Sequence, residues 1–222
     1  MRKRIKRILY SDAFAVVSGL IIVPILSFVL ICISPESPLY TSISRMAWVH
    51  NLWLTTFIWA VAVMSVIAWL TYRLAYTGIF DRNKRRAFLL WQFISIILVF
   101  AGCLLFPAKD GVESIIFANY IHDYLTAVAW MMYVTGLIVY SFSARKKDKF
   151  LGLIGLGLMG YIIFSSLFFL IKVIDPQSYV GASAVSEIYI INNLSVYLVV
   201  MYIAQKIIYG KENKQNDRDK ST

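Results

Sequence analysis

Two histidines and a few carboxylates stand out in a sequence that is otherwise strongly apolar. His50 and His122 are the two histidines of the chain, and each lies near the start of a long apolar segment. Asp123 follows His122 directly, and Glu187 lies near the start of a third such segment. Imidazole and carboxylate groups bind ligands, ligate metals and transfer protons, so these residues are the first candidates for chemistry. What they can do depends on the elements that position them.

The apolar segments predict transmembrane helices. Of 222 residues, 59% are hydrophobic and 15% are charged, whereas a soluble domain has roughly 45–50% apolar and about 25% charged residues. A helix needs about 20 apolar residues to cross the hydrocarbon core of a membrane. Six segments qualify: 13–33, 47–72, 87–106, 121–142, 151–174 and 188–209. The chain is therefore predicted to be an all-α polytopic membrane protein, a bundle of six transmembrane helices.

The basic residues predict the orientation of this bundle. Cytoplasmic segments of membrane proteins are enriched in Lys and Arg. All but three of the 22 basic residues cluster before the first span, around the 2–3 and 4–5 connections, or around the end of the sixth span. The exceptions are Arg45, Lys109 and Lys172. This distribution predicts a multi-pass protein of the cell membrane with cytoplasmic N- and C-termini.

The distribution of charge also divides the chain into three segments and argues against a nucleic-acid partner. Residues 1–12 are predicted to form a basic cytoplasmic N-terminus, residues 13–209 the transmembrane domain, and residues 210–222 a cytoplasmic tail. The tail is polar and has no apolar face, so it is predicted to be disordered. The net charge of +10 does not indicate nucleic-acid binding, because the basic residues alternate with apolar spans.

On this topology the polar residues of interest gather at the outer ends of the even-numbered helices. His50 and Asn51 are predicted to open helix two, His122 and Asp123 to open helix four, and Glu187 to open helix six. Ionisable groups at membrane depth usually face the protein interior or water. The sequence therefore predicts one outward-facing pocket, with these candidate ligand-binding residues: Arg45, His50, Asn51, His122, Asp123, Glu187 and Asn192.

Each of these residues also has an ordinary structural interpretation. Polar groups cost little within a turn of the interface. Asp123 and Glu187 could each cap the N-terminus of their own helix, where a negative charge is favourable. The two histidines could be interfacial residues without a ligand. The sequence leaves the pocket and these structural roles equally open.

The leading functional interpretation is a pocket for a lipid-like or small amphipathic ligand, or for a membrane-protein partner. Arg45 would pair with a phosphate or carboxylate of the ligand. Membrane lipids are the expected partners, together with another membrane protein or further copies of the chain. This interpretation requires no catalysis, cofactor or metal.

The alternatives use the same residues for other chemistry. A membrane-embedded hydrolase or acyltransferase would use His122 as base, Asp123 or Glu187 to orient it, and a serine as nucleophile, although no G-x-S-x-G nucleophile elbow is present. A b-type haem protein would ligate its iron with His50 and His122 from neighbouring helices. An ion-coupled transporter is disfavoured because spans two to five carry almost no internal charge.

Three further features predict packing. Gly155, Gly157 and Gly160 spell a dinucleotide-binding motif, but they lie inside an apolar span and so predict a close approach between helices. Pro24 predicts a kink in the first span. Cys32 and Cys103 both lie near outer span ends, and we expect two separate thiols, although the sequence leaves a disulfide open.

The chain resembles an uncharacterised bacterial six-span membrane family that sits near the DRAM/Frag-type proteins. The resemblance rests on the first outer loop at 38–44, on Leu105-Phe106-Pro107 at the end of helix three, and on His122 followed by small residues. Ser42, Ser44, Pro107 and His122 match the family pattern, whereas Asp123 departs from it and Glu187 has no known counterpart. The resemblance implies a six-helix membrane domain and, through eukaryotic relatives, a link to membrane-lipid and lysosomal processes.

Overall fold

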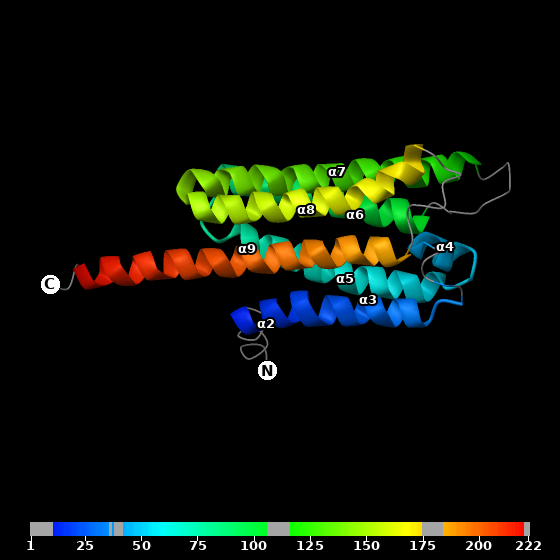
Figure 1. Ribbon diagram of the computed structural model, residues 1–222, viewed down its shortest axis with the longest axis horizontal. Helices are drawn as coiled ribbons and strands as arrows, with labels where there is room; N and C mark the ends of the chain where they lie inside the picture. Colours follow the sequence, from blue (N-terminus) through cyan, green and yellow to red (C-terminus); the bar gives the residue numbers. More distant parts are fainter. Residues whose placement is uncertain (1–10, 36, 38–41, 106–115, 175–183, 220–222) are drawn as a thin grey trace.

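Every regular element that the structure describes is a helix. The structure is a computed structural model and describes residues 11–35, 37, 42–105, 116–174 and 184–219. Of these, the side chains at 104–105, 116–120, 168–174 and 209–219 lie outside the description. The elements are α2 (Asp12–Val17), the π-helical turn η1 (Ser18–Ile22), α3 (Val23–Cys32), α4 (Ile43–Trp48), α5 (Trp53–Ala75), α6 (Arg82–Leu105), α7 (Ile116–Lys147), α8 (Lys149–Ile174) and α9 (Ala184–Asp219) (Figure 1).

Six helical stretches are long and apolar enough to cross a membrane, which confirms the predicted all-α bundle of six spans. They are Asp12–Cys32, Trp53–Ala75, Arg82–Cys103, Ile121–Lys147, Lys149–Leu167 and Ala184–Ile208. Both termini, the 76–81 turn and the α7–α8 connection lie at one end of the bundle, here called the terminal end (Figure 1). The short helix α4 lies at the other end, here called the α4 end.

The second span begins later than the sequence predicts. The predicted helix at 47–72 is broken at 49–52, where α4 ends and α5 has not yet begun. Asn51 has a φ of +56°, the left-handed conformation that asparagine tolerates better than most residues and that ends a helix. His50 and Asn51 therefore lie in a turn, and the prediction that they open helix two is wrong.

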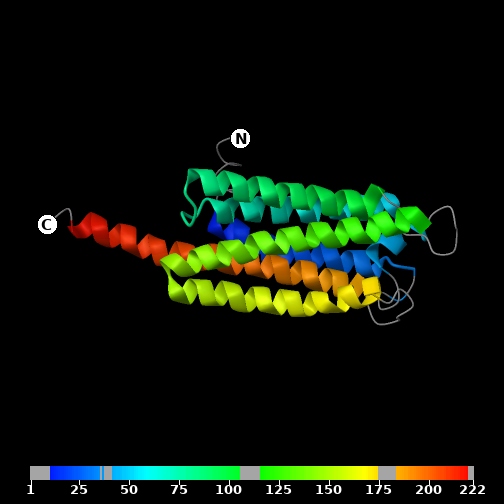
Figure 2. The same ribbon diagram turned by 90° about the horizontal axis from the view of Figure 1, so that it is seen from above.

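The helices α5 to α9 form a closed ring with the first span packed outside it. Each helix of this series contacts the next, and α5 closes the ring against α9. The first span, α2–η1–α3, packs on the seam between α5 and α9 (Figures 1 and 2). Half of the apolar window is buried in the fourth and sixth spans, compared with 22–39% in the other four. The helices α7 and α9 therefore contribute most to the interior.

Tyrosine hydroxyls in this interior bond to side chains of other helices. The Tyr133 and Thr71 hydroxyls lie 2.6 Å apart, and the Tyr140 and Thr77 hydroxyls 2.9 Å apart, so α7 is joined both to α5 and to the turn that follows it. Tyr197 of α9 lies 2.7 Å from Ser141 of α7. Because lipid tails cannot accept hydrogen bonds, buried hydroxyls must be satisfied within the protein.

At the terminal end an ionic cluster joins the first span to α5 and α9. Arg73 is 7% exposed and donates to Asp12 Oδ1 at 3.3 Å and to the Tyr202 hydroxyl. Tyr202 and Lys206 donate to the same carboxylate oxygen at 2.6 and 2.7 Å. A buried guanidinium is tolerated when it is paired in this way.

The π-helical turn η1 ends two residues before Pro24, where the sequence predicts a kink. Within this turn the Gly19 carbonyl accepts a hydrogen bond of 2.6 Å from the Ser195 hydroxyl of α9. A Cβ atom on Gly19 would lie 2.3 Å from Val199 Cγ2. The glycine is therefore what allows the first span to pack closely on α9.

The glycine motif of α8 is only partly a packing face. A Cβ atom on Gly155 would lie 2.7 Å from Ser141 Oγ, so α8 approaches α7 closely at this glycine. Cβ atoms on Gly157 and Gly160 would have no neighbour within 4 Å. Cys32 and Cys103 are separate free thiols, as expected.

The tail predicted to be disordered continues α9 as far as Asp219, so that prediction is wrong for residues 210–219. Lys, Glu, Gln and Arg in this segment are good helix formers and extend a helix that is already nucleated. Residues 220–222 and most of the predicted N-terminal segment 1–12 lie outside the described residues.

Gly19→Ala is expected to lower the free energy of unfolding by about 1–3 kcal/mol, because the added methyl group collides with a valine whose χ1 is restricted in a helix. The measurement is unfolding of the purified protein in a denaturing-detergent titration. Gly157→Ala is the matched control, since its methyl group meets open space. Equal stability of the two variants would contradict the packing role of Gly19.

Candidate functional site

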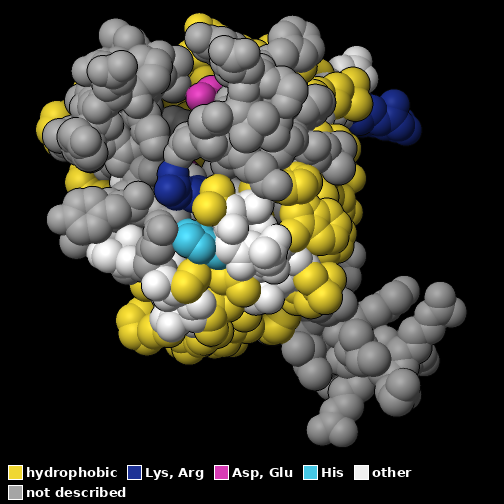
Figure 3. Space-filling model, turned by 90° about the vertical axis from the view of Figure 1, so that its right-hand side faces the viewer, with side chains coloured by type: hydrophobic (Ala, Val, Ile, Leu, Met, Phe, Trp, Pro, Cys, Tyr) yellow, Lys and Arg dark blue, Asp and Glu magenta, His cyan; other side chains and the backbone are white. Residues whose placement is uncertain are grey.

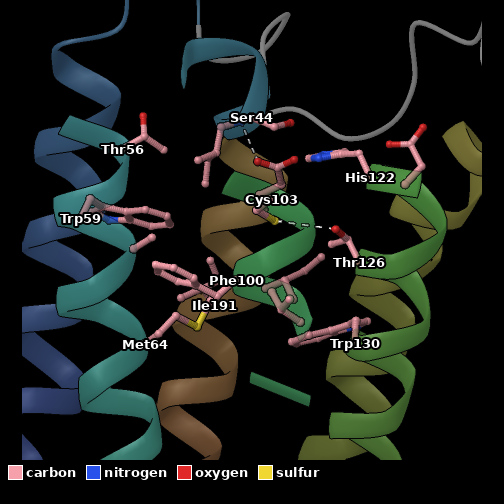
Figure 4. A pocket seen from close by; sticks show the side chains of 16 residues that line it. Ser44, Thr56, Trp59, Met64, Phe100, Cys103, His122, Thr126, Trp130 and Ile191 are labelled. Carbon is pink, nitrogen blue, oxygen red and sulfur yellow. Dashed lines mark hydrogen bonds between the residues drawn. The ribbon is translucent and has the colours of Figure 1, made fainter. Parts of the chain in front are cut away.

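A cavity of about 120 Å³ lies at the α4 end of the bundle. Helices α4, α5, α6, α7 and α9 all contribute to its walls (Figure 4). The lining residues are Ile43, Ser44, Thr56, Trp59, Ala60, Met64, Val99, Phe100, Cys103, His122, Asp123, Thr126, Trp130, Glu187, Ile190 and Ile191. Polar groups line one part of the cavity, and the rest is apolar.

The deeper part of the cavity is built from aromatic rings. Figure 4 shows the rings of Trp59 and Trp130 extending toward one another from opposite sides, with Phe100 and Met64 between them. The indole N–H of Trp130 donates to Ser166 Oγ at 3.1 Å, which fixes that ring. Rings held by neighbouring helices form a preformed apolar surface of the kind that takes small ligands.

Two polar atoms of the lining residues have no hydrogen-bond partner in the described part of the chain. They are the Thr56 hydroxyl oxygen and the Trp59 indole nitrogen, and both are buried. Thr56 is 1% exposed and Trp59 is 7% exposed. A buried polar group without a partner costs about 1–3 kcal/mol. Two such groups beside one cavity are what a bound molecule would satisfy.

His122 is held in the cavity wall by the packing of α7 on α6. It is 6% exposed, and its Nδ1 lies 2.7 Å from the Gly102 carbonyl oxygen. A carbonyl only accepts hydrogen bonds, so Nδ1 carries a proton. A Cβ atom on Gly102 would lie 2.6 Å from Thr126 Oγ1, so the glycine permits this close approach. In the neutral form of the ring, Nε2 then carries no proton and can accept a hydrogen bond.

Glu187 joins α9 to α4. Its Oε2 accepts a hydrogen bond of 2.8 Å from the backbone N–H of Ile43, the first residue of α4. Ser42 caps the same helix and accepts from the Arg45 N–H at 3.1 Å. The sequence offers Glu187 as a cap for its own helix, and the hydrogen bond to Ile43 makes it a cap of α4. The carboxylate therefore holds a short helix beside the cavity.

The remaining wall carries Asp123 and a thiol. Asp123 is exposed and lies inside α7, which begins at Ile116, so it does not cap that helix. Cys103 Sγ lies 3.8 Å from Thr126 Oγ1, as Figure 4 shows.

The structure brings together some of the predicted site residues and separates others. His122, Asp123 and Glu187 line the cavity, whereas Arg45, His50, Asn51 and Asn192 are not among its lining residues. The expectation that His50 shares this cavity with His122 and Glu187 is wrong, because the break before α5 places His50 in the turn after α4. Figure 3 shows this end of the molecule, with a basic and a histidine side chain near the middle of its described part.

The sequence prediction missed the apolar wall and the two threonines in it. On α5, Thr56 and Trp59 are three residues apart and Ala60 and Met64 are four apart, and Phe100 and Cys103 are three apart on α6. Such spacing puts residues on one helix face. In a chain that is apolar throughout, however, hydropathy does not show which face is internal.

This cavity does not offer two histidine ligands to a haem, because His122 lines it and His50 does not. Among the same residues no group of three or more His, Cys, Asp and Glu side chains could hold a metal ion.

Comparisons with known proteins add no relationship. Neither the scan against family models nor the searches of curated proteins and of solved structures found a match. The resemblance to the family near the DRAM/Frag-type proteins stays a prediction.

Glu187→Ala is expected to loosen α4 and expose the cavity, because the Ile43 N–H loses a charged acceptor worth about 1.5–3 kcal/mol. The measurement is the rate at which Cys103 reacts with a maleimide in a Cys32→Ser background, and the rate should rise severalfold. Glu187→Gln is the control, since it keeps an acceptor oxygen and should react nearly as slowly as the parent. Equal rates for all three proteins would show that Glu187 does not hold α4 closed.

Proposed function

We propose that this protein binds a small amphipathic, lipid-like molecule in the cavity at the α4 end. The apolar part of the ligand lies among Trp59, Phe100 and Trp130, and its polar head lies toward Glu187 and His122. The observation that carries this proposal is the pair of buried polar atoms on Thr56 and Trp59 that lack a partner beside an apolar cavity. Membrane lipids are the natural source of such a ligand.

The charges of the cavity favour a ligand head with hydrogen-bond donors. The charged side chains among the lining residues are both acids, Asp123 and Glu187, and Arg45 is not one of them. This replaces the expectation that Arg45 pairs with a phosphate or carboxylate of the ligand. An ammonium or hydroxyl head would suit the acids, and the aromatic rings favour an ammonium further. Of the two, only a hydroxyl could also accept a hydrogen bond from the Trp59 indole N–H. An anionic head would be repelled.

The size of the cavity limits how much of the ligand it encloses. A cavity of about 150 Å³ holds a benzene ring, and this one measures about 120 Å³. The enclosed part is therefore a short chain segment or a single ring. A longer molecule has to extend out of the cavity.

A second candidate function rests on Ser44, which lines the same cavity as His122. The proton on Nδ1 leaves Nε2 of a neutral ring as the acceptor that a general base needs. Such a site would transfer or hydrolyse an acyl group of the bound molecule. The Gly102 carbonyl would orient the histidine from its Nδ1 side.

The orientation that we propose is that of a cell-membrane protein with cytoplasmic termini and an outward-facing cavity. Basic residues support it: those at the terminal end include Arg73, Lys84, Lys146 and Lys149, whereas Arg45 is the one basic side chain that is described at the α4 end.

Ligand binding is tested with four twelve-carbon probes: dodecylamine, dodecanol, dodecanoic acid and dodecyl phosphate. Quenching of tryptophan fluorescence in the purified protein reports binding. We expect the amine and the alcohol to bind at least tenfold more tightly than the two anions. Thr56→Val should weaken binding about two- to tenfold, the range for one hydrogen bond, while Thr55→Val, an exposed neighbour on the same helix, should have no effect.

Two outcomes would change this account. Tighter binding of the anions, or equal binding by Thr56→Val and the parent, would overturn the proposed ligand class. Hydrolysis of dodecyl acetate that is lost in both His122→Ala and Ser44→Ala would make the second candidate the correct function.

The orientation is tested with single cysteines in a cysteine-free background. Val49→Cys at the α4 end should react with a membrane-impermeant maleimide on intact cells. Lys149→Cys at the terminal end should react only after permeabilisation. The opposite pattern would reverse the orientation and place the cavity on the cytoplasmic side.

A further inference from the structure

A second hollow lies at the terminal end, far along the bundle from the cavity. It is an open groove of about 700 Å³ between α6 and α7, and the turn before α6 closes one end of it. Its floor includes Phe80, Phe88 and Trp91, and its rim includes Lys84, Lys146 and Lys147. The groove combines an apolar floor with a basic rim.

The floor of the groove is rigid. The Phe80 ring packs against the rings of Phe88 and Tyr140, with centroid separations of 5.2 and 5.4 Å. The Trp91 indole N–H donates to the Met132 carbonyl at 2.6 Å, and 43% of this side chain stays exposed. A Cβ atom on Gly136 would lie 3.1 Å from Trp91 Cδ1, so a glycine is needed beside that ring. Phe80 and Phe88 are buried beneath the floor, and the exposed apolar surface is that of Trp91 and Val139.

The rim of the groove is positively charged. Lys84 is 73% exposed, and Lys146 and Lys147 are also exposed. The one acid paired with a rim lysine in the described residues is Asp81, at 3.3 Å from Lys84 Nζ. Lys147 Nζ also donates to the Gly78 carbonyl, so Lys146 is the rim lysine whose Nζ has no bond to the turn before α6 in the described residues.

The spacing of these groups fits the depth profile of a membrane. Lys84 precedes Trp91 by seven residues on α6, which is about 10 Å along a helix axis. Lys146 follows Thr135 by eleven residues on α7, or about 16 Å. The lysines therefore lie at headgroup depth, and the apolar floor extends into the upper hydrocarbon.

We infer that this groove binds an anionic phospholipid. Lys84 and Lys146 hold the phosphate and the acidic headgroup, and one acyl chain runs along Phe88, Trp91 and Val139. Basic pockets between transmembrane helices recognise anionic headgroups in this way. The inference is independent of the ligand proposed for the cavity, because the two sites share no lining residue.

The test measures lipid retention. The purified full chain is incorporated into nanodiscs with equal amounts of phosphatidylglycerol and phosphatidylcholine, extracted mildly, and analysed by native mass spectrometry. We expect phosphatidylglycerol to be retained preferentially. Lys84→Gln with Lys146→Gln should reduce this preference about tenfold or more, since each cation near an anionic surface contributes about 1 kcal/mol.

The control removes the same charge elsewhere at the same end. Arg86 and Lys149 are exposed and do not line the groove, so Arg86→Gln with Lys149→Gln should leave the preference within about twofold. Val139→Trp keeps every charge but fills the groove, and it should also release the lipid. Equal losses in the control pair, or retention in Val139→Trp, would overturn the site in favour of diffuse surface charge. Thr56→Val should not change the retention of phosphatidylglycerol, and this result would show that the groove binds lipid independently of the cavity.

Discussion

A hydrocarbon environment offers no hydrogen bonds, and the interior of this protein is arranged around that constraint. Buried tyrosines of α7 and α9 bond to hydroxyls on other helices, as Tyr133 does to Thr71 and Tyr197 to Ser141. These bonds need α5, α7 and α9 to face one another, so they fix which helices surround the interior. The first span has few such groups and packs outside the ring, joined to it by Ser195 and by the Asp12–Arg73 cluster.

The cavity lies where this pairing stops. Thr71 bonds to the carbonyl of Ile67 and to Tyr133, whereas Thr56, on the same helix nearer the α4 end, has no partner for its hydroxyl in the described residues. The Trp130 indole N–H donates to Ser166, but the Trp59 indole N–H across the cavity has no acceptor in the described residues. At Thr56 and Trp59 the missing partners lie beside an empty volume, whereas other buried polar atoms without a partner among the described residues, such as Ser27 Oγ and Gln92 Oε1, belong to residues that do not line the cavity. A cavity with polar atoms in its wall differs from a purely apolar packing defect, which stays dry.

The spans and their number could be predicted from the sequence because hydropathy and length are local properties, and so is the clustering of basic residues. The position of His50 could not, because it depends on one backbone angle at Asn51 that breaks a continuous apolar segment. The role of Glu187 could not be predicted from the sequence either, because its partner Ile43 lies 144 residues away in the chain. Thr56 and Trp59 were missed for a third reason: in an apolar chain, composition does not distinguish an internal face from a lipid-facing one.

The two hollows of the bundle have opposite chemistry, and the membrane explains why. At the terminal end, lysines can stay at headgroup depth because their long side chains reach water or lipid phosphate, so a groove there becomes cation-rimmed. At the α4 end basic residues are scarce, and Glu187 is kept at the cavity because a helix N-terminus needs an acceptor for its backbone N–H groups. The same carboxylate that stabilises α4 therefore also sets the sign of the cavity. A mutation that made this cavity basic would have to provide another acceptor for Ile43, which links ligand class to the stability of the fold.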